Sequence, residues 1–553
     1  MLGIRIFIVS MLLMCSNSLL VAQTTLQEII FTRADSLRGT LTKARTWWDV
    51  QQYKILVEPN AVDKTISGKV DILFKTTGSY DTMQIDLQEP MELNKAYLGE
   101  ESLRYIREGN VYFIILNHPL KIGSESTLAL SFKGKVREAI RPPWDGGWIF
   151  TKDKNGNPWM SVACQGLGAS VWYPCKDHQS DEPDKGALLR ISVPDSLVAV
   201  GNGRLIGKRS YKEGWTVYDW EVKNPINNYN IVPYIGKYVS FKETHKGEKG
   251  NLDCEYWVLD YELEKAKEQF KQVPLMLKAF EHWFGPYPFY EDGYKLVQSP
   301  HLGMEHQSAV AYGNGFQNGY RGRDLSGSGY GLKWDFIIVH ESGHEWFGNN
   351  ITSKDLADMW LHEGFTNYSE TLFTDFHYGK EAGNAYVQGT RKLIRNEAPI
   401  IAHYNVNEEG SGDMYYKGGN LVHYIRQLFD NDEKFRTALR KLNSKWYHQT
   451  TTSNEIEKFF SDELKMNLQS LFDQYLRNTH IPTLEIQQSK NEIKYKWIDC
   501  IKSFNAPVKI SFNKTTQWIY PSTQWKTMKL TGTNTSTKVD TNFYVGIKET
   551  SLD

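Results

Sequence analysis

Two histidines four positions apart, His340 and His344, constrain the fold of this 553-residue chain more than any other feature. In an α-helix, residues i and i+4 lie on one face with Cβ atoms about 5 to 6 Å apart. Both imidazoles can therefore reach one metal ion only if this segment is helical. The largely apolar residues 334–339 lead into the motif and residues 348–350, Gly-Asn-Asn, follow it. This pattern predicts a buried helix that ends near residue 348.

Two glutamates complete a set that can hold catalytic zinc. Glu341 lies beside the histidine pair on the helix circumference, where a general base is needed. Glu363 follows His344 after 18 intervening residues, inside a second predicted amphipathic helix over 358–370. Catalytic zinc typically keeps three protein ligands and an open position for water, so the predicted ligands are His340, His344 and Glu363. The alternative is an ordinary buried helix whose histidines are satisfied by hydrogen bonds.

This spacing resembles that of the gluzincin metallopeptidases, and within them the M1 aminopeptidases, whose signature is H-E-x-x-H, 18 residues and Glu. A second M1 motif, G-x-M-E-N, corresponds to residues 302–306, of which Met304 and Glu305 match. The resemblance implies that Glu305 holds the free α-amino group of a peptide, while the strand with Gly303 and Met304 binds the peptide backbone. An α-ammonium group, with a pKa of about 7.7 to 8.0, suits a carboxylate partner. The alternative for Glu305 is a solvated strand residue.

Two further segments are similar to M1 elements. Residues 415–418 match a Y-x-K-G element, which implies that Tyr415 stabilises the oxyanion of the tetrahedral intermediate. In the N-terminal half, a segment ahead of a Pro-Cys-x-Asp turn implies that Gln165 reaches into the substrate site. Packing in a polar or aromatic core is the alternative for both residues, and it is the interpretation we favour for the neighbouring Tyr416.

The chain departs from the M1 pattern at two histidines and in its C-terminal part. His306 replaces the usual Asn of G-x-M-E-N, and His362 replaces the usual Asn before the third ligand. We expect His306 to change the contact with the peptide backbone or to add a group that titrates near neutral pH. The resemblance runs from about Trp47 to about Thr483, and only about 70 residues follow Pro482. We therefore expect a short form without the long helical domain of many M1 enzymes, with a cavity that is more open or closed by a partner subunit.

The resemblance implies a zinc-dependent aminopeptidase with one Zn²⁺ ion, in which Glu341 activates water. Its implied partners are peptides with a free N-terminus. The alternatives are a zinc endopeptidase or epoxide-hydrolysing enzyme with the same site, or a non-catalytic peptide-binding protein. A net charge of −1 gives the chain no excess of positive charge for binding nucleic acid. The sequence does not indicate an oligomeric state.

The first 22 residues predict export to the periplasm or secretion. Arg5 precedes an apolar run over residues 6–14, and Ala22 marks the expected cleavage site of a secretory signal peptide. A lipid anchor at Cys15 is the less favoured alternative, because the residue before it is large rather than small. No other stretch is apolar for long enough to form a transmembrane helix.

Four cysteines follow the expected signal peptide, and none forms a C-x-x-C pair. This excludes the usual cysteine zinc and thioredoxin-like motifs. A disulfide between Cys164 and Cys175 is the first choice, but four cysteines allow three complete pairings and all of them stay open.

Hydrophobic patterning predicts a multidomain α+β fold. From about Asp49 to Thr244, short alternating runs broken by Gly, Asn and Pro predict an antiparallel β domain. Helical periodicity then begins, with clear helices over Glu262–Phe284 and Asn420–Phe429, and the Gly-rich segment 313–331 is expected to form a mobile loop. Strand-like runs return after residue 482. The expected divisions are a signal peptide at 1–22, an N-terminal β domain at 23–245, a thermolysin-like mixed α/β zinc domain at 246–482 and a small C-terminal β domain at 483–553.

Overall fold

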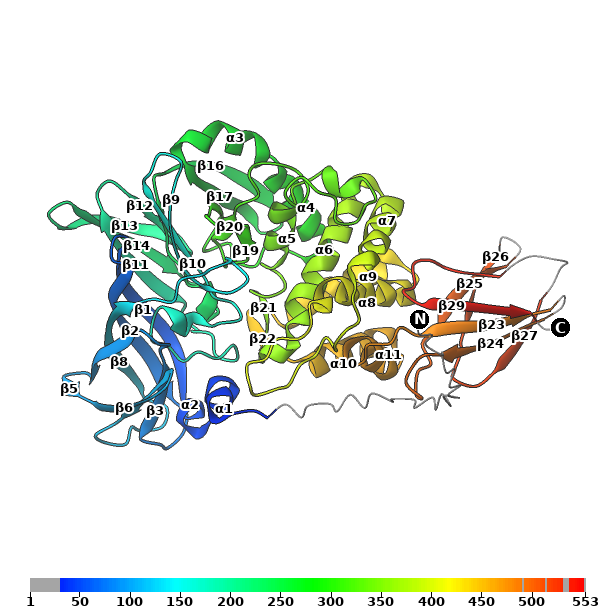
Figure 1. Ribbon diagram of the computed structural model, residues 1–553, viewed down its shortest axis with the longest axis horizontal. Helices are drawn as coiled ribbons and strands as arrows, with labels where there is room; N and C mark the ends of the chain where they lie inside the picture. Colours follow the sequence, from blue (N-terminus) through cyan, green and yellow to red (C-terminus); the bar gives the residue numbers. More distant parts are fainter. Residues whose placement is uncertain (1–29, 490–491, 513–514, 531–536, 552–553) are drawn as a thin grey trace, which may run out of the picture.

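The computed structural model describes residues 30–489, 492–512, 515–530 and 537–551. The expected signal peptide at 1–22 therefore lies outside the described residues. The molecule is elongated: a β-rich N-terminal unit lies at one end, a mostly helical unit in the middle and a small β unit at the other end (Figure 1). This arrangement confirms the predicted multidomain α+β fold.

The N-terminal unit is built around an eight-stranded sheet with the strand order β13-β14-β11-β1-β2-β8-β4-β5. On the central strand β1, Tyr53, Ile55 and Val57 are fully buried and alternate with more exposed residues, as expected for a sheet with one buried face. Neighbouring strands of this sheet are antiparallel except β1 and β11, which run parallel. The strands are β1 (Trp48–Asn60), β2 (Thr65–Thr76), β4 (Glu92–Leu98), β5 (Glu101–Ser102), β8 (Glu125–Lys135), β11 (Ala187–Pro194), β13 (Arg204–Lys212) and β14 (Trp215–Val222).

Two short helices and two smaller sheets complete this unit. The helices precede the first strand, and the sheets have the orders β3-β7-β6 and β12-β15-β10-β9. The elements are α1 (Arg33–Gly39), α2 (Lys43–Thr46), β3 (Thr82–Asp86), β6 (Arg104–Glu108), β7 (Val111–Ile115), β9 (Gly147–Lys152), β10 (Pro158–Ala163), β12 (Val198–Val200) and β15 (Tyr234–Gly236).

A five-stranded sheet, β16-β17-β18-β20-β19, carries the chain into the helical unit. Its first strand spans residue 246, where the second domain is expected to begin. Its last strand, β19, is an edge strand that pairs only with β20 among the described residues. The strands are β16 (Tyr238–Gly247), β17 (Gly250–Leu259), β18 (Tyr294–Gln298), β19 (Gly303–Met304) and β20 (Val310–Tyr312).

The helical segment predicted over Glu262–Phe284 is confirmed, but it is divided into two helices, α3 (Leu263–Gln269) and α4 (Gln272–Phe284). The break lies at Phe270, whose buried ring packs edge-on against Tyr312 with centroids 4.9 Å apart. Pro274 stands in the first turn of α4. Since proline lacks an N–H group and its ring would clash with the carbonyl of residue 270 in a continuous helix, the helix must end and restart here.

The helix that carries the paired histidines is α5 (Phe336–Gly343). It begins after Asp335, whose carboxylate accepts hydrogen bonds from the backbone N–H groups of Ile337 and Ile338 at 3.0 and 3.3 Å. The helix ends at Gly343, so His344 is its C-cap residue and keeps helical backbone angles. The two histidines therefore lie on one face, as predicted from their spacing.

Helices α6 (Trp360–Tyr378) and α8 (Asp413–Phe429) approach closely because each presents a glycine to the other. A Cβ atom on Gly418 would lie 3.0 Å from the Cα atom of Gly364. A Cβ atom on Gly364 would lie 3.2 Å from the carbonyl oxygen of Met414. Helix α8 contains the predicted helix Asn420–Phe429 and begins seven residues earlier.

The Gly-rich segment 313–331 forms a loop that ends in the 3₁₀ turn Tyr330–Leu332. Asn314 holds it by donating hydrogen bonds to the carbonyl oxygens of Gln317 and Gly319, both at 2.8 Å. The other elements of the helical unit are β21 (Ile351–Ser353), α7 (Lys380–Thr390), α9 (Asp432–Lys445), β22 (Gln449–Thr451), α10 (Ser453–Leu464) and α11 (Gln469–Leu476).

After residue 482 the described chain forms two small sheets, β27-β24-β23-β29 and β26-β25-β28. They share a hydrophobic core with the helical unit, where Phe543 packs edge-on against Tyr424 of α8 with centroids 4.8 Å apart. The strands are β23 (Thr483–Gln488), β24 (Glu492–Ile498), β25 (Val508–Phe512), β26 (Thr515–Ile519), β27 (Lys526–Lys529), β28 (Lys538–Val539) and β29 (Gly546–Ser551).

All four cysteines in the described part of the chain are free thiols. The disulfide favoured between Cys164 and Cys175 is not formed: the thiol of Cys164 lies 3.5 Å from the carbonyl oxygen of Tyr229, while the backbone of Cys175 pairs with that of Asp86. Among the described residues, no helix is both long enough and apolar enough to cross a bilayer.

The glycine contact between α6 and α8 can be tested with Gly418→Val. We expect this change to lower the midpoint of thermal unfolding, because overpacking of this kind destabilises proteins by about 1 to 3 kcal/mol. Gly412→Val is the matched control, since a Cβ atom at Gly412 meets nothing within 4 Å. Equal unfolding midpoints of the two variants, measured by circular dichroism, would contradict the contact.

Candidate active site

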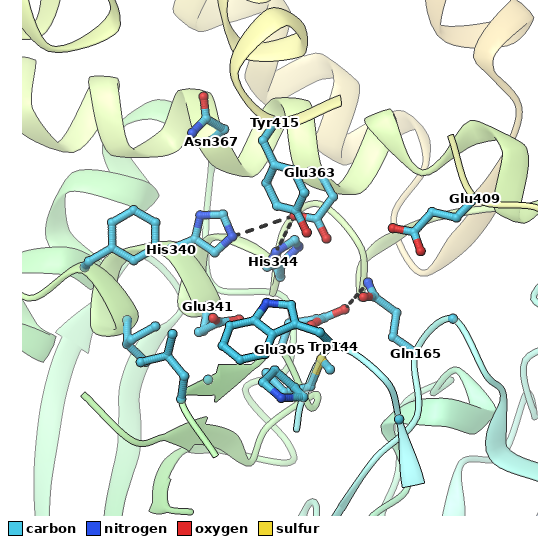
Figure 2. A pocket seen from close by; sticks show the side chains of 18 of the residues that line it. Trp144, Gln165, Glu305, His340, Glu341, His344, Glu363, Asn367, Glu409 and Tyr415 are labelled. Carbon is cyan, nitrogen blue, oxygen red and sulfur yellow. Dashed lines mark hydrogen bonds and ion pairs between the residues drawn. The ribbon is translucent and has the colours of Figure 1, made fainter. Parts of the chain in front are cut away.

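The predicted site residues line one cavity of about 690 Å³. The helical unit and the five-stranded sheet form most of its wall, and loops of the N-terminal unit at residues 143–146 and 165–167 close the opposite side (Figure 2). The cavity brings together Gln165, Gly303, Met304, Glu305, His340, Glu341, His344, Glu363 and Tyr415. Residues from both units, up to 250 positions apart in the sequence, thus meet in a single site.

The two histidines are held so that their Nε2 atoms face the same point. Nδ1 of His340 lies 2.7 Å from a carboxylate oxygen of Glu370, and Nδ1 of His344 lies 2.9 Å from the carbonyl oxygen of Phe347. Because both partners only accept hydrogen bonds, Nδ1 must carry the proton in each neutral ring and Nε2 keeps its lone pair. The Nε2 atoms lie 3.7 and 3.4 Å from Oε2 of Glu363.

Glu363 stands in the first turn of α6 and is 2% exposed. Its Oε2 atom is buried without a hydrogen-bond partner among the described residues. This oxygen faces both Nε2 atoms, and a buried carboxylate oxygen without a hydrogen-bond donor is unfavourable unless a cation binds it. Two imidazole nitrogens and one carboxylate oxygen facing each other are the donor set of a catalytic zinc ion, so these residues fit the metal that the motif predicts.

Glu341 lies beside this donor set. Its carboxylate and the rings of His340 and His344 offer ligand atoms that all lie within 4.8 Å of one another. Glu363 is nevertheless the better third ligand, because its unpartnered oxygen faces both Nε2 atoms. A Cβ atom on Gly303 would lie 2.4 Å from Oε1 of Glu341, so glycine is needed for this carboxylate to fit. Burial raises the pKa of Glu341 to about 7, which suits a group that accepts and then releases a proton.

Glu305 follows strand β19 and is 2% exposed, which excludes the solvated alternative. Its Oε1 atom accepts hydrogen bonds from Nε2 of Gln165 at 2.6 Å and from the hydroxyl of Tyr229 at 2.9 Å. Its backbone oxygen accepts a hydrogen bond from the side chain of Asn349 at 2.8 Å. The carboxylate is therefore fixed at one oxygen, and the other can receive a donor from a ligand.

Tyr415 lies in the first turn of α8, and its ring stacks near that of His340 with centroids 6.1 Å apart. Figure 2 shows its side chain reaching down beside Glu363 toward the histidines. Burial and the nearby negative charge of Glu363 raise the pKa of Tyr415 well above its ordinary value, so the phenol keeps its proton. Tyr416 also lines the cavity and is half-buried, so the core-packing interpretation favoured for it is wrong.

The two unusual histidines do not line the cavity, contrary to the effect on peptide binding expected for His306. His306 is fully buried with Nδ1 2.5 Å from the hydroxyl of Tyr234, and burial lowers its pKa well below the usual range. His362 is also fully buried, and its Nε2 accepts a hydrogen bond from the backbone N–H of Ser353 at 2.8 Å. Burial lowers the pKa of His362 to about 3. Both rings are neutral structural groups and do not titrate near pH 7.

Sequence reasoning missed several residues of the site. Glu370, which orients His340, lies seven positions after Glu363 on the same helix, so helical periodicity could have found it. Tyr229, Trp144 and Glu409 come from distant loops and turns. No local sequence pattern marks them, because only the tertiary fold brings them to the cavity.

Comparisons with known proteins agree with this site. Residues 274–475 match the model of the peptidase family M1 domain. Leukotriene A-4 hydrolase of Xenopus laevis is 24% identical over 337 residues, covering 58% of this chain and 52% of that protein. Aminopeptidase B of Mus musculus is 24% identical over 410 residues, covering 68% of this chain and 59% of that protein. The chain thus spans about half the length of the curated relatives it matches.

Solved structures show the same fold. An M1 zinc metallopeptidase from Deinococcus radiodurans, bound to a Tyr-Ser-Ala substrate, aligns with a TM-score of 0.62 and 21% identity over 76% of this chain and 92% of that one. A two-domain M1 zinc metallopeptidase bound to L-tryptophan aligns equally well, with a TM-score of 0.62 and 21% identity. Motif spacing, the family match and the fold agree: residues 274–475, which carry the metal-binding donor set, form a peptidase family M1 domain.

Proposed function

We propose that the protein is a zinc-dependent aminopeptidase that removes the first residue from peptides with a free N-terminus. The position of Glu305 carries this proposal: a buried carboxylate with one oxygen held by Gln165 and Tyr229, in the same cavity as the metal-binding donor set. An α-ammonium group supplies charge-assisted donors to such a carboxylate. An internal peptide segment would place an uncharged amide there instead.

The proposed zinc ligands are Nε2 of His340, Nε2 of His344 and Oε2 of Glu363. Bound zinc would polarise the scissile carbonyl and lower the pKa of a water molecule. Glu370 and the backbone of Phe347 support the metal by fixing the two rings through Nδ1.

The remaining chemistry falls to side chains of the cavity. Glu341 accepts a proton from the attacking water and passes it to the leaving amine. The protonated phenol of Tyr415 donates a hydrogen bond to the carbonyl oxygen as negative charge develops on it. Glu305 fixes the α-amino group, so that the first peptide bond, rather than a later one, lies between Glu341 and Tyr415.

Strand β19 gives the peptide backbone a place to bind. One edge of Gly303–Met304 pairs with β20, and both residues line the cavity. An extended peptide can add to the free edge through main-chain hydrogen bonds, which do not depend on the peptide's sequence. The strand leads directly into Glu305, so the bound peptide would begin at the amine anchor.

Turnover of aminoacyl arylamides and their N-acetylated counterparts tests the proposal. We expect hydrolysis of the free amines, lost with a chelator and restored by Zn²⁺. Acetylation should lower kcat/KM by roughly tenfold to a hundredfold or more, the usual range for losing a hydrogen bond to a charged group. Glu305→Gln should lower kcat/KM on free amines by a similar factor and narrow the gap between the two substrates.

Glu341→Gln is the control for contaminating peptidases, because it should keep zinc and lose most hydrolysis. Equal turnover of free and acetylated peptides would indicate an endopeptidase. Turnover of an epoxide without any arylamide hydrolysis would indicate an epoxide-hydrolysing enzyme. Zinc binding without turnover would indicate a peptide-binding protein.

The orienting role of Glu370 gives a separate prediction. Its second carboxylate oxygen accepts a hydrogen bond from Tyr386 at 2.6 Å. The amide of Glu370→Gln keeps only one acceptor oxygen and removes the negative charge that strengthens the hydrogen bond from His340. We expect zinc affinity to fall by about tenfold to a hundredfold, the usual effect of losing such a partner, measured by competition with a chromogenic chelator. Glu381→Gln, at an exposed position of α7, is the control. Equal zinc affinities would exclude the role.

We also propose that the protein is exported, on the basis of the sequence of residues 1–22 alone. Expression in a Gram-negative bacterium, followed by fractionation and N-terminal sequencing, should yield a periplasmic protein that begins at Gln23. Cytoplasmic protein with an intact N-terminus would contradict export.

A further inference from the structure

Glu409 lines the cavity but has no role in the chemistry above. It lies in the loop before α8 and is directed toward Gln165 (Figure 2). Its side chain is open to the cavity and makes no hydrogen bond or ion pair with the described residues. Glu409 is therefore a carboxylate of the cavity that no described residue engages and to which the chemistry above assigns no role.

The other carboxylates of the cavity are engaged or assigned. Asp145 accepts hydrogen bonds from the backbone N–H groups of Ile140 and Arg141. Glu305 receives the hydrogen bonds described above, and Glu341 and Glu363 belong to the proposed hydrolytic machinery. Glu409 is thus the carboxylate of this cavity that is available to bind a ligand.

No cationic side chain balances this carboxylate. The described residues that line the cavity include neither lysine nor arginine. Desolvation of the carboxylate by the cavity walls, together with the negative charges of Glu363 and Glu305, raises the pKa of Glu409 to about 7. A positive charge brought beside Glu409 would offset both effects.

The position of Glu409 shows which part of a substrate it faces. A Cβ atom on Gly166 would lie 3.3 Å from its Oε2 atom, and Asn407 of the same loop donates a hydrogen bond to the carbonyl oxygen of Gly166 at 3.2 Å. Gly166 follows Gln165, which is bonded to Glu305. Glu409 therefore belongs to the same wall as the amine anchor, on the far side of Gln165.

We propose that Glu409 binds the cationic side chain of lysine or arginine at the first position of the substrate, so that the enzyme prefers basic N-terminal residues. This inference rests on the proposed aminopeptidase activity. With its α-amine at Glu305 and its carbonyl at the zinc ligands, the first residue projects its side chain from the Cα atom between them. If this side chain extends past Gln165, its guanidinium or ammonium group lies beside the carboxylate of Glu409. Gly166 has no side chain, which leaves room for that group.

Arginyl and citrullyl arylamides test the proposal, because citrulline has nearly the shape of arginine without its charge. For the zinc-loaded wild-type protein we expect kcat/KM to be about tenfold to a hundredfold higher for arginine, the usual range for a charged hydrogen bond. Glu409→Gln should bring the ratio close to one, and Glu409→Asp should give an intermediate ratio. Glu408→Gln is the matched control: Glu408 is paired with Nδ1 of His403 at 2.5 Å and does not line the cavity, so the ratio should stay at the wild-type value.

Equal use of the two arylamides by the wild-type protein would overturn the proposal without any variant. An arginine preference that survives in Glu409→Gln would also overturn it, since another group would then bind the charge. If Glu409→Gln does not fold, as judged by circular dichroism, an unchanged ratio in Glu409→Asp decides against it. Failure to hydrolyse any aminoacyl arylamide would instead reject the aminopeptidase activity itself.

Discussion

The convergence of two imidazole nitrogens and one carboxylate oxygen on a single point is the constraint on which the rest of the structure depends. It leaves Oε2 of Glu363 buried without a donor, which a protein tolerates where a cation binds. The neighbouring structure keeps these atoms in place. Asp335 fixes the start of α5, Glu370 fixes one ring, and the contact of Gly364 with Gly418 sets the spacing of α6 and α8.

The metal-facing part of the site could be predicted from sequence because it depends on local helix geometry. The spacing of His340 and His344 places them on one face of any helix, and Glu363 lies in a segment whose periodicity is also helical. The strands of the N-terminal unit were predictable for a similar reason, since β1 buries every second residue over Tyr53–Val57. The break at Phe270 was not foreseen, although Pro274 carried the signal for it.

Substrate-facing residues could not be predicted in the same way. Gln165 was found only through a family resemblance, and Tyr229 was missed, although both donate to the same oxygen of Glu305. Their contacts join positions that are 140 and 76 residues apart, and no local pattern encodes such a meeting. For His306 the sequence predicted a functional effect that the structure does not support. The residue departs from a family motif, which suggested a role in substrate binding, but its buried ring contacts Tyr234 instead.

The metal-facing residues and the substrate-facing residue Gln165 are supported by different hydrophobic cores. Gln165 and Gly166 belong to loops packed on the N-terminal hydrophobic core, whereas the histidines, Glu363 and Tyr415 stand on helices of the second core. The metal-binding donor set is therefore complete within one unit, but Glu305, the proposed amine anchor, is held by residues of both units. Substitutions in the N-terminal loops can then change which substrate is bound while the donor set stays intact. A cavity built between two cores thus separates the requirements of hydrolysis from those of recognition.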